Sequence, residues 1–568
     1  MGETSELHAV VAEPESNKPA SNLAPDKARA VVTALTATAI FCAALAIWLC
    51  FDKHVPACDE ANHVMNGLTY TNLLQHARPL RAAWWHNFFT VNTYYPPVGT
   101  LTMGAACAII KDPILALQLV KIFWLAVLSL SVGAIAFMVS GSSIAVAAAI
   151  CLVNVCSLTC DLSHSALLDL PLIAMVAAAL AAIYWKDGSA SLKRSVTAGI
   201  ILGIAIMTKQ VAIAFLGFPV LLDSILTLKR NWNKKGLYSI ALMALPALFL
   251  CLPWTIINYN SVQKLNNEIA ADLSMRGSTS SRILFNLEYY LGSWLYCASP
   301  LVLVTALLGF GAQKKEQHKK LLPLWISILP AALALSLISC QPARDRYVAP
   351  IVILIAISGG CGLAHLVKRN KTAFVVITAI FLPLAALQYI SFNLSPYPIA
   401  QTTWVAEIAR FLHCSLREHV SPFFDKSNSI VRMQHISPSP RGGEIANQIL
   451  DCIEKEDGKN SSWLNITAFS PDLDVHELEL LAKLRMLAIK PTTSRLWTAL
   501  GDKEDFSESK ALNYRWYVIK DGDQGFRFAD QQSKLAHENL IDFVRHRYQL
   551  IKKFQAPNKE RIDLYLAP

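Results

Sequence analysis

The sequence has few charged residues for its length. Of its 568 residues only 16% are charged, whereas 54% are hydrophobic, and the mean hydropathy is +0.37. An ordinary soluble domain carries roughly 25% charged residues, so this composition argues against a soluble multidomain enzyme. The high apolar content and the lack of a short repeat also exclude a disordered or fibrous chain.

Motifs for nucleotides, disulfides and zinc are lacking as well. The sequence contains neither a Walker A loop nor a dinucleotide-binding fingerprint. Its thirteen cysteines are an odd number, most lie inside apolar runs, and none forms a CxxC pair. A disulfide framework and a zinc site of the CxxC type are therefore not expected.

The charged residues are unevenly distributed along the chain. Half of them, 46, lie from Asn393 onward, so the tail has the composition of a soluble domain and the preceding part that of a membrane protein. The net charge is +10. Because a basic membrane protein commonly carries its excess Lys and Arg in cytoplasmic loops, we expect no nucleic-acid partner.

Long apolar runs predict the membrane domain. A transmembrane helix needs roughly 20 apolar residues, and about eleven runs qualify. The predicted fold class is therefore mainly α, a polytopic helical bundle followed by a small α/β domain. The predicted spans are residues 31–50, 122–139, 144–160, 170–185, 195–209, 211–228, 237–254, 291–311, 321–340, 347–366 and 373–392.

The loop charges orient these spans. If the tail 1–28 is cytoplasmic, almost every second loop is cytoplasmic and carries several Lys or Arg residues, as the positive-inside rule requires. We therefore expect a multi-pass protein of the inner or plasma membrane. The predicted division is a membrane domain 29–392, a linker 393–443 and an extracytoplasmic α/β domain 444–568.

Two long loops are predicted at the outer face. Loop 52–97 contains six aromatic residues between Trp84 and Tyr95, and loop 258–288 leads into a second aromatic segment. Aromatic side chains of this kind concentrate at the membrane–water interface. The two loops are predicted to form a lid over a site at the outer leaflet.

Acidic residues at the outer face have two interpretations each. Asp59 and Glu60 form either part of a solvated loop or a general base at the membrane surface. Asp169 precedes Leu170 and Pro171, which also fits a helix N-cap. His164 lies between Asp161 and Asp169 and is more often a loop histidine than a ligand.

Three cations lie on the face where cations are depleted. Lys209 ends a predicted span, and Arg344 and Arg346 occupy the short outer loop before Tyr347. Lipid phosphates are one partner for them. The phosphate of a lipid-linked substrate is the other, since Arg offers bidentate geometry and Lys a point charge.

Taken in order, these elements resemble the GT-C glycosyltransferases, in particular the protein O-mannosyltransferase and aminoarabinose-transferase branch. The resemblance spans about residues 31–366. It rests on Asp-Glu in the first outer loop and on four later motifs: Tyr-Pro-Pro-Val at 95–98, Leu-Leu-Asp-Leu-Pro-Leu at 167–172, a Gly-x4-Thr-Lys element at 203–209, and Arg-Tyr-x-x-Pro at 346–350. Tyr95 departs from the aminoarabinose transferases, which have a phosphate-facing lysine there, and the span count is smaller than in the best-known members.

The resemblance implies an inverting sugar transfer from a polyprenyl-phosphate donor at the outer face. Asp59 would be the general base, assisted by Glu60 and Asp169, and Lys209, Arg344 and Arg346 would bind the phosphate. Tyr95, His164 and Tyr347 would line the substrate, with membrane lipids as further partners and the acceptor unknown. No cofactor is required, although some relatives bind a divalent metal through carboxylates, which keeps a metal at Asp59 and Asp169 open.

Two other functions compete with this one. A transporter or flippase of a lipid-linked or small substrate would usually show two related halves and charges near the membrane midplane. The sequence shows no such repeat, and its candidate charges lie at one face. The third alternative is a non-catalytic sensor whose outer domain binds a ligand.

The tail predicts alternating strands and helices. Strands are expected at 461–469, 515–520, 526–529, 547–554 and 562–565, and a helix at 475–489. Asp521–Gly522 is typical of a turn between two strands. The segment 429–443, with two Ser-Pro pairs, is expected to be the linker.

Overall fold

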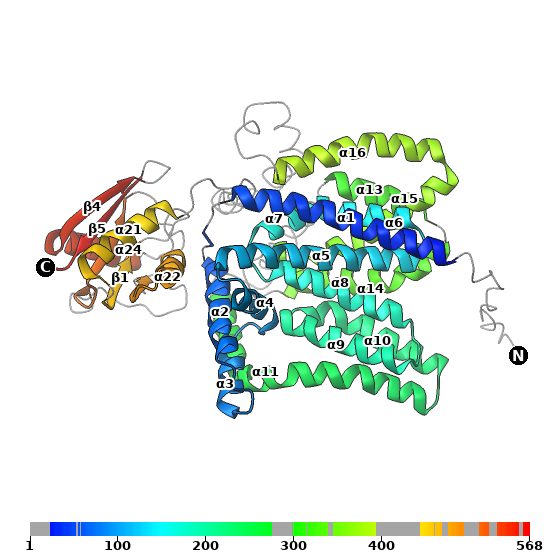
Figure 1. Ribbon diagram of the computed structural model, residues 1–568, viewed down its shortest axis with the longest axis horizontal. Coiled ribbons are helices and arrows are strands. Elements are labelled where there is room, and N and C mark those ends of the chain that lie inside the picture. The colour runs from blue at the N-terminus through cyan, green and yellow to red at the C-terminus, as the bar shows by residue number, and fades with distance from the viewer. Residues whose placement is uncertain are drawn as a thin grey trace, which may run out of the picture.

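A computed structural model gives the fold of the chain. It describes residues 23–52, 55–56, 58–274, 298, 300–313, 315–338, 345–393, 443–458, 460–467, 475–493, 511–521, 531–555 and 560–568. Within these residues the chain forms a large helical bundle and a small α/β domain (Figure 1). The predicted fold class is confirmed.

The described part of each of the eleven apolar runs falls on a helix or on a pair of helices. Six of the described helices are long and apolar enough to cross a membrane, and a bent pair would make a seventh. The count of eleven spans therefore remains a prediction. The helices on these runs are α1 (Leu23–Phe51), α5 (Pro113–Ser140), α6 (Ser143–Val155), α7 (Ser157–His164), α8 (Asp169–Lys186), α9 (Leu192–Thr208), α10 (Ala212–Arg230), α11 (Lys234–Ser274), α13 (Pro300–Gly311), α14 (Lys315–Ile338), α15 (Ile351–Arg369) and α16 (Lys371–Asn393).

The long loop 52–97 is largely helical, which corrects the sequence expectation. It contains α2 (Cys58–Gln75) and α3 (Ala82–Thr90), and α4 (Val98–Ile109) follows. Helix α2 packs closely on α4, because a Cβ atom at Gly104 would lie 2.5 Å from Cβ of Tyr70. Asp59 and Glu60 consequently lie in the first turn of a helix.

A second correction concerns the segment 258–288. Helix α11 runs on to Ser274, so the described beginning of this loop is helical. The polar sequence beyond Asn258 contains neither Gly nor Pro up to Ser274, and these two residues are the strongest helix breakers. The side chains of Trp254 and Asn258 also anchor α11, because they donate to the carbonyls of Asn92 and Phe89.

The third predicted span is bent by 64° between α6 and α7. Cys156, at the break, has an extended backbone. As a result Asp161 and His164 lie within α7, and the connection to α8 is only residues 165–168.

Glycines allow close approach in the core of the bundle. Helix α15 is the most buried of the candidate spans, with 83% of its apolar window inside the structure. A Cβ atom at Gly362 of α15 would lie 1.8 Å from the backbone oxygen of Gly309 in α13. Small residues at such crossings let two helix backbones touch, which is a main source of stability between membrane helices.

Replacing Gly362 by alanine should therefore push α13 and α15 apart. We expect a loss of stability of about 1–3 kcal/mol, as for overpacked cores, measured as a lower midpoint of thermal unfolding in detergent. Gly217→Ala in α10 is the matched control, because a Cβ atom added at Gly217 would have nothing within 4 Å. Equal midpoints for the two variants would contradict the close contact.

The C-terminal domain is built on a five-stranded sheet. Its strand order is β2-β1-β3-β5-β4, with β1 parallel to β2 and β3, and β5 antiparallel to β3 and β4. The strands are β1 (Ser462–Ile466), β2 (Ile489–Thr493), β3 (Trp516–Lys520), β4 (Gln549–Gln555) and β5 (Arg561–Leu566), and the helices are α21 (Glu444–Asp457), α22 (Val475–Leu484) and α24 (Gln531–Arg547).

Most predicted tail elements are present, but one boundary was wrong and two helices were missed. The helix expected over 475–489 ends at Leu484, and Ile489 instead begins β2, which pairs with β1. Helices α21 and α24 were not predicted. The expected strand 526–529, Gly522 of the expected turn, and nearly all of the linker lie outside the described residues.

The tail docks at the end of the bundle that carries α2. Leu480 of α22 packs with Ala61, Val64 and Met65 of α2, and Figure 1 shows the domain beyond that end. Among the cation-rich connections, Arg230 contacts Asp187, and the Tyr184 hydroxyl donates to the carbonyl of Lys320.

A candidate active site built on four charged side chains

Four charged side chains from distant parts of the chain meet at the tail-facing end. An Nη atom of Arg346 lies 2.7 Å from Oδ2 of Asp59, and the other Nη lies 3.9 Å from Oδ2 of Asp169. Lys209 Nζ lies 2.7 Å from Oδ1 of Asp169. The structure therefore brings together two predicted carboxylates and two predicted cations in one alternating chain, which we call the ion cluster.

Solvent access differs sharply within the ion cluster. The Asp169 side chain is 1% exposed and that of Arg346 is 10% exposed, whereas that of Asp59 is 47% exposed. Burial opposes the charge of Arg346, but Asp169 and Asp59 outweigh this and raise its pKa above the ordinary value. Arg346 is thus a permanent cation, and Asp59 is the carboxylate that a substrate can reach.

Local structure explains how these charges are held. Asp59 and Asp169 each lie in the first turn of a helix, where the helix dipole favours a negative charge. Asp169 is not the N-cap of α8, which corrects one of its two interpretations. Leu168 occupies that position, and the carboxylate of Asp169 binds the cations instead.

Lys209 and Arg346 both come from short connections. Lys209 follows the last residue of α9 and has an extended backbone. Arg346 lies in the 3₁₀ turn η2 (Asp345–Val348), directly before α15. Both residues therefore lie at helix ends, and from there their long side chains extend to the carboxylates.

Glu60 has a different environment from its neighbour Asp59. It is buried, and its Oε2 accepts a hydrogen bond of 2.7 Å from the backbone N–H of Ala166. This contact fixes the connection between α7 and α8, which carries Asp169 at its end. Glu60 therefore joins two parts of the site through the backbone.

Aromatic rings surround the cations. Lys209 Nζ lies 5.7 Å from the ring centre of Tyr95 and 5.6 Å from that of Tyr347. The Arg346 guanidinium lies 5.9 Å from the same Tyr347 ring. These distances fit cation–π contacts. Tyr95 therefore presents an aromatic ring to Lys209 at the position where the aminoarabinose transferases have a lysine.

His63, which is not among the predicted site residues, belongs to the same region. Its ring packs edge-on against Tyr95, with centroids 5.4 Å apart. Burial lowers its pKa to about 4, an effect that Asp59 opposes and Lys209 supports, so the imidazole is neutral near pH 7. Its spacing of four residues from Asp59 on one helix was the available signal, because such residues share a helix face.

One predicted site residue is not part of this arrangement. His164 is buried, and its ring stacks on the indole of Trp48 with centroids 3.7 Å apart. Arg344 lies outside the described residues. The described residues also contain no group of three or more His, Cys, Asp or Glu side chains that could hold a metal ion.

Comparisons with known proteins agree on the fold. Residues 95–257 match the family of dolichyl-phosphate-mannose-protein mannosyltransferases. No curated protein matches the sequence significantly. Among solved structures, ArnT from Cupriavidus metallidurans bound to undecaprenyl phosphate superposes with a TM-score of 0.54 and 14% identity, covering 94% of this chain and 97% of that one.

The apo state of the same ArnT gives a TM-score of 0.50, again at 14% identity, with 93% and 97% of the two chains covered. The match extends over nearly the full length of both chains, membrane bundle and tail together. The chain therefore has the GT-C glycosyltransferase fold.

Proposed function

We propose that the chain is a membrane glycosyltransferase that moves a sugar from a polyprenyl-phosphate donor to an acceptor, with inversion at the anomeric carbon. The observation that carries this proposal is the ion cluster, in which an accessible carboxylate lies beside two buried cations. The mannosyltransferase match and the ArnT-like fold support it, since that ArnT structure contains undecaprenyl phosphate.

In this proposal the cations receive the donor phosphate. Arg346 presents a planar set of N–H donors that suits phosphate, and Lys209 adds a compact charge. Because Arg346 now binds Asp59 directly, an arriving phosphate competes with Asp59 for the guanidinium. Donor binding thus releases Asp59 from its ion pair and makes it a better base.

The reaction follows from the same geometry. Asp59 accepts the proton of the acceptor hydroxyl or amine as that atom forms a bond to the anomeric carbon. The bond between the anomeric carbon and the phosphate oxygen breaks, and Lys209 and Arg346 stabilise the growing negative charge on the leaving phosphate. Asp169, buried between the two cations, positions them, and Glu60 holds the adjoining connection.

The orientation in the membrane is part of the proposal. Asp59 of the ion cluster lies on α2, the helix on which the tail packs, and the Lys- and Arg-rich connections are those that the sequence predicts to be cytoplasmic. The positive-inside rule places the cation-rich end in the cytoplasm. The reaction and the tail would then be extracytoplasmic.

A transfer assay tests this function against a flippase. We expect the purified chain in proteoliposomes, supplied with polyprenyl-phosphate [¹⁴C]mannose and a bacterial envelope lipid extract as acceptor, to release free polyprenyl phosphate and to label a new product. A flippase would move the intact donor between leaflets and release none. Movement of the donor without release would contradict the proposal.

A further inference from the structure

Lys121 is a buried charged residue inside an apolar helix. It is the one Asp, Glu, Lys or Arg among the 28 residues of α5, and its side chain is buried. Ionisable side chains within membrane-spanning segments are rare, and each of them is by default a functional candidate. None of the family-like motifs contains Lys121, and the proposed reaction gives it no role.

The Lys121 ammonium binds the connection between α7 and α8. Its Nζ donates a hydrogen bond of 2.6 Å to the carbonyl oxygen of His164. Two residues further along the chain, the backbone N–H of Ala166 donates to Oε2 of Glu60. A cation on α5 and a carboxylate on α2 thus hold two peptide groups of one short segment, residues 164–166, which we call the anchored segment.

The two charges that hold the anchored segment also stabilise each other. Burial opposes the charge of Lys121, and the carboxylates of Glu60 and Asp52 favour it. Glu60 is itself buried. Because a buried charge that loses its partner is strongly destabilising, Lys121 and Glu60 depend on each other to remain at this position.

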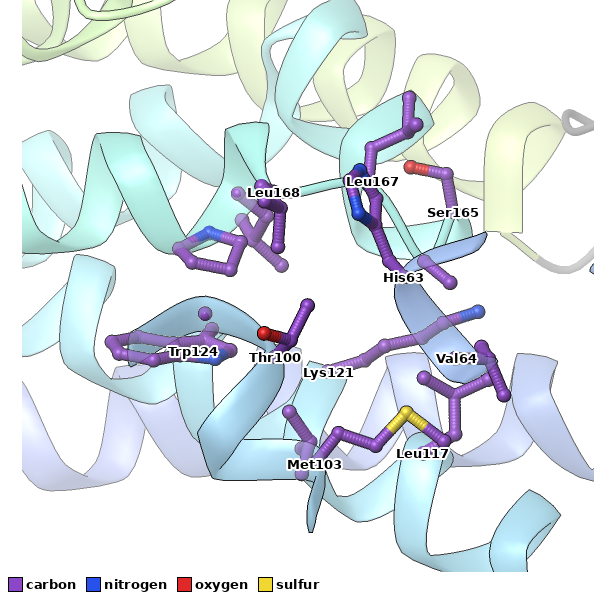
Figure 2. A pocket seen from close by; sticks show the side chains of 15 residues that line it. His63, Val64, Thr100, Met103, Leu117, Lys121, Trp124, Ser165, Leu167 and Leu168 are labelled. Atoms are coloured by element: carbon purple, nitrogen blue, oxygen red, sulfur yellow. The ribbon is translucent and has the colours of Figure 1, made fainter. Parts of the chain in front are cut away.

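The residues between the anchored segment and Asp169 pack against α4. A Cβ atom at Gly99 of α4 would lie 2.6 Å from Cδ2 of Leu168. Figure 2 shows Lys121, Ser165 and Leu168 around the same small cavity. The connection that leads into Asp169 is therefore held by polar bonds at its beginning and by helix packing at its end.

Asp169 follows this connection directly and holds both cations of the ion cluster. Its carboxylate lies 2.7 Å from Lys209 Nζ and 3.9 Å from an Nη atom of Arg346. A displacement of about 1 Å in a catalytic arrangement can cost about 10²-fold in rate, even when the substituted residue is far from the chemistry. The position of the anchored segment therefore matters for the placement of both cations.

We propose that Lys121 is a positioning residue for the transfer reaction. By holding the carbonyl of His164 it fixes the connection that carries Asp169, and Asp169 in turn fixes the two cations that face the leaving phosphate. Lys121 acts through this chain of contacts and not by touching the substrate. The inference rests on the proposed function and deepens it.

Lys121→Met tests this role, because it removes the ammonium and keeps an unbranched side chain of similar length. The kcat for release of polyprenyl phosphate, measured per folded protein, should fall by about 10- to 100-fold. The KM for the donor should stay within about threefold, since both cations remain and the loss concerns the transition state. Hydrogen–deuterium exchange of the peptide 160–168 should become faster, because the anchored segment has lost a bond.

A double variant separates this role from stability. Lys121→Met leaves the buried carboxylate of Glu60 without that cation and should lower the midpoint of thermal unfolding. Lys121→Met combined with Glu60→Gln removes both charges and should raise the midpoint again, while the glutamine can still accept the N–H of Ala166. The kcat should remain low. A kcat that recovers together with the midpoint would show a purely structural role and overturn the proposal.

The matched control is a second buried pair, at the other end of α8, where Lys186 Nζ lies 2.6 Å from Oδ2 of Asp223. Lys186→Met combined with Asp223→Asn removes the same kinds of charge and should leave both kcat and the exchange of peptide 160–168 unchanged. An unchanged kcat in Lys121→Met, or an equal loss in the control, would overturn the positioning role while leaving the transferase in place. No transfer by the wild-type chain from any polyprenyl-phosphate sugar would contradict the proposed function and the inference with it.

Discussion

Asp59→Asn should reduce sugar transfer by about 10²- to 10⁴-fold, the usual contribution of a positioned general base. Asparagine has nearly the same shape and can still accept a hydrogen bond from Arg346, but it cannot take a proton from the acceptor. The measurement is kcat for release of polyprenyl phosphate at saturating donor. Because the Asp59 side chain is 47% exposed, the substitution should not disturb folding.

Asp542→Asn is the matched control, because Asp542 is exposed on α24 in the tail. It should transfer sugar at the wild-type rate. Full activity in Asp59→Asn would show that Asp59 is not the base. If both variants lost the same fraction of transfer activity, the loss would come from the preparation of the protein and not from the removal of the base.

Arg346→Gln should lower kcat/KM by about 10²- to 10³-fold, the range found when one donor to a developing oxyanion is removed. Arg346 bridges Asp59 and Asp169, and it faces the position proposed for the phosphate. Arg346→Lys should recover only part of the loss, because an ammonium provides the charge without the planar pair of donors.

The effect of the Arg346 substitutions on stability has to be measured separately from their effect on the transfer rate. Asp169 is buried, and among the described residues Lys209 alone would remain as its cationic partner in Arg346→Gln, so some destabilisation is expected. Thermal unfolding in detergent measures this effect independently. If Arg346→Lys unfolds at the wild-type temperature and also transfers sugar at the wild-type rate, the bidentate role is wrong.

The membrane bundle was predictable because its signal is local. Runs of about 20 apolar residues and a change in charge density identify the helices and the tail. Helix α2 and the extension of α11 were missed because both are polar. Their helicity depends on packing, for example of α2 against α4 through Gly67 and Gly104.

The contacts within the candidate site, in contrast, join residues that are far apart in the sequence. Asp59 and Arg346 are separated by 287 positions in the sequence, and no periodicity relates them. The predicted topology and the order of the family-like motifs indicated only that they share the outer face of the membrane, and neither predicts that the two side chains touch. His63, Lys121 and Trp124 carry no motif, and only the packing of α2, α4 and α5 places them around one cavity.

In the tail, short-range patterns gave wrong boundaries. The leucine-rich spacing of α22 suggested a helix up to Ile489, but the chain enters β2 there. The parallel pairing of β2 with β1, in which Ser462 aligns with Ile489, determines this boundary. Strand β1 precedes the segment in which the helical spacing occurs, so that spacing carries no information about the pairing.

The docking of α22 on α2 has a consequence for biosynthesis. Lys483 and Met65, which are in contact, are separated by 418 positions, and a ribosome adds only about 5–20 residues per second. The helix that carries Asp59 is therefore made tens of seconds before the surface that covers it. During that interval the apolar side of Ala61, Val64 and Met65 lacks its cover from Leu480, which makes it suited to recognition by a chaperone or a membrane protease that monitors unfinished chains.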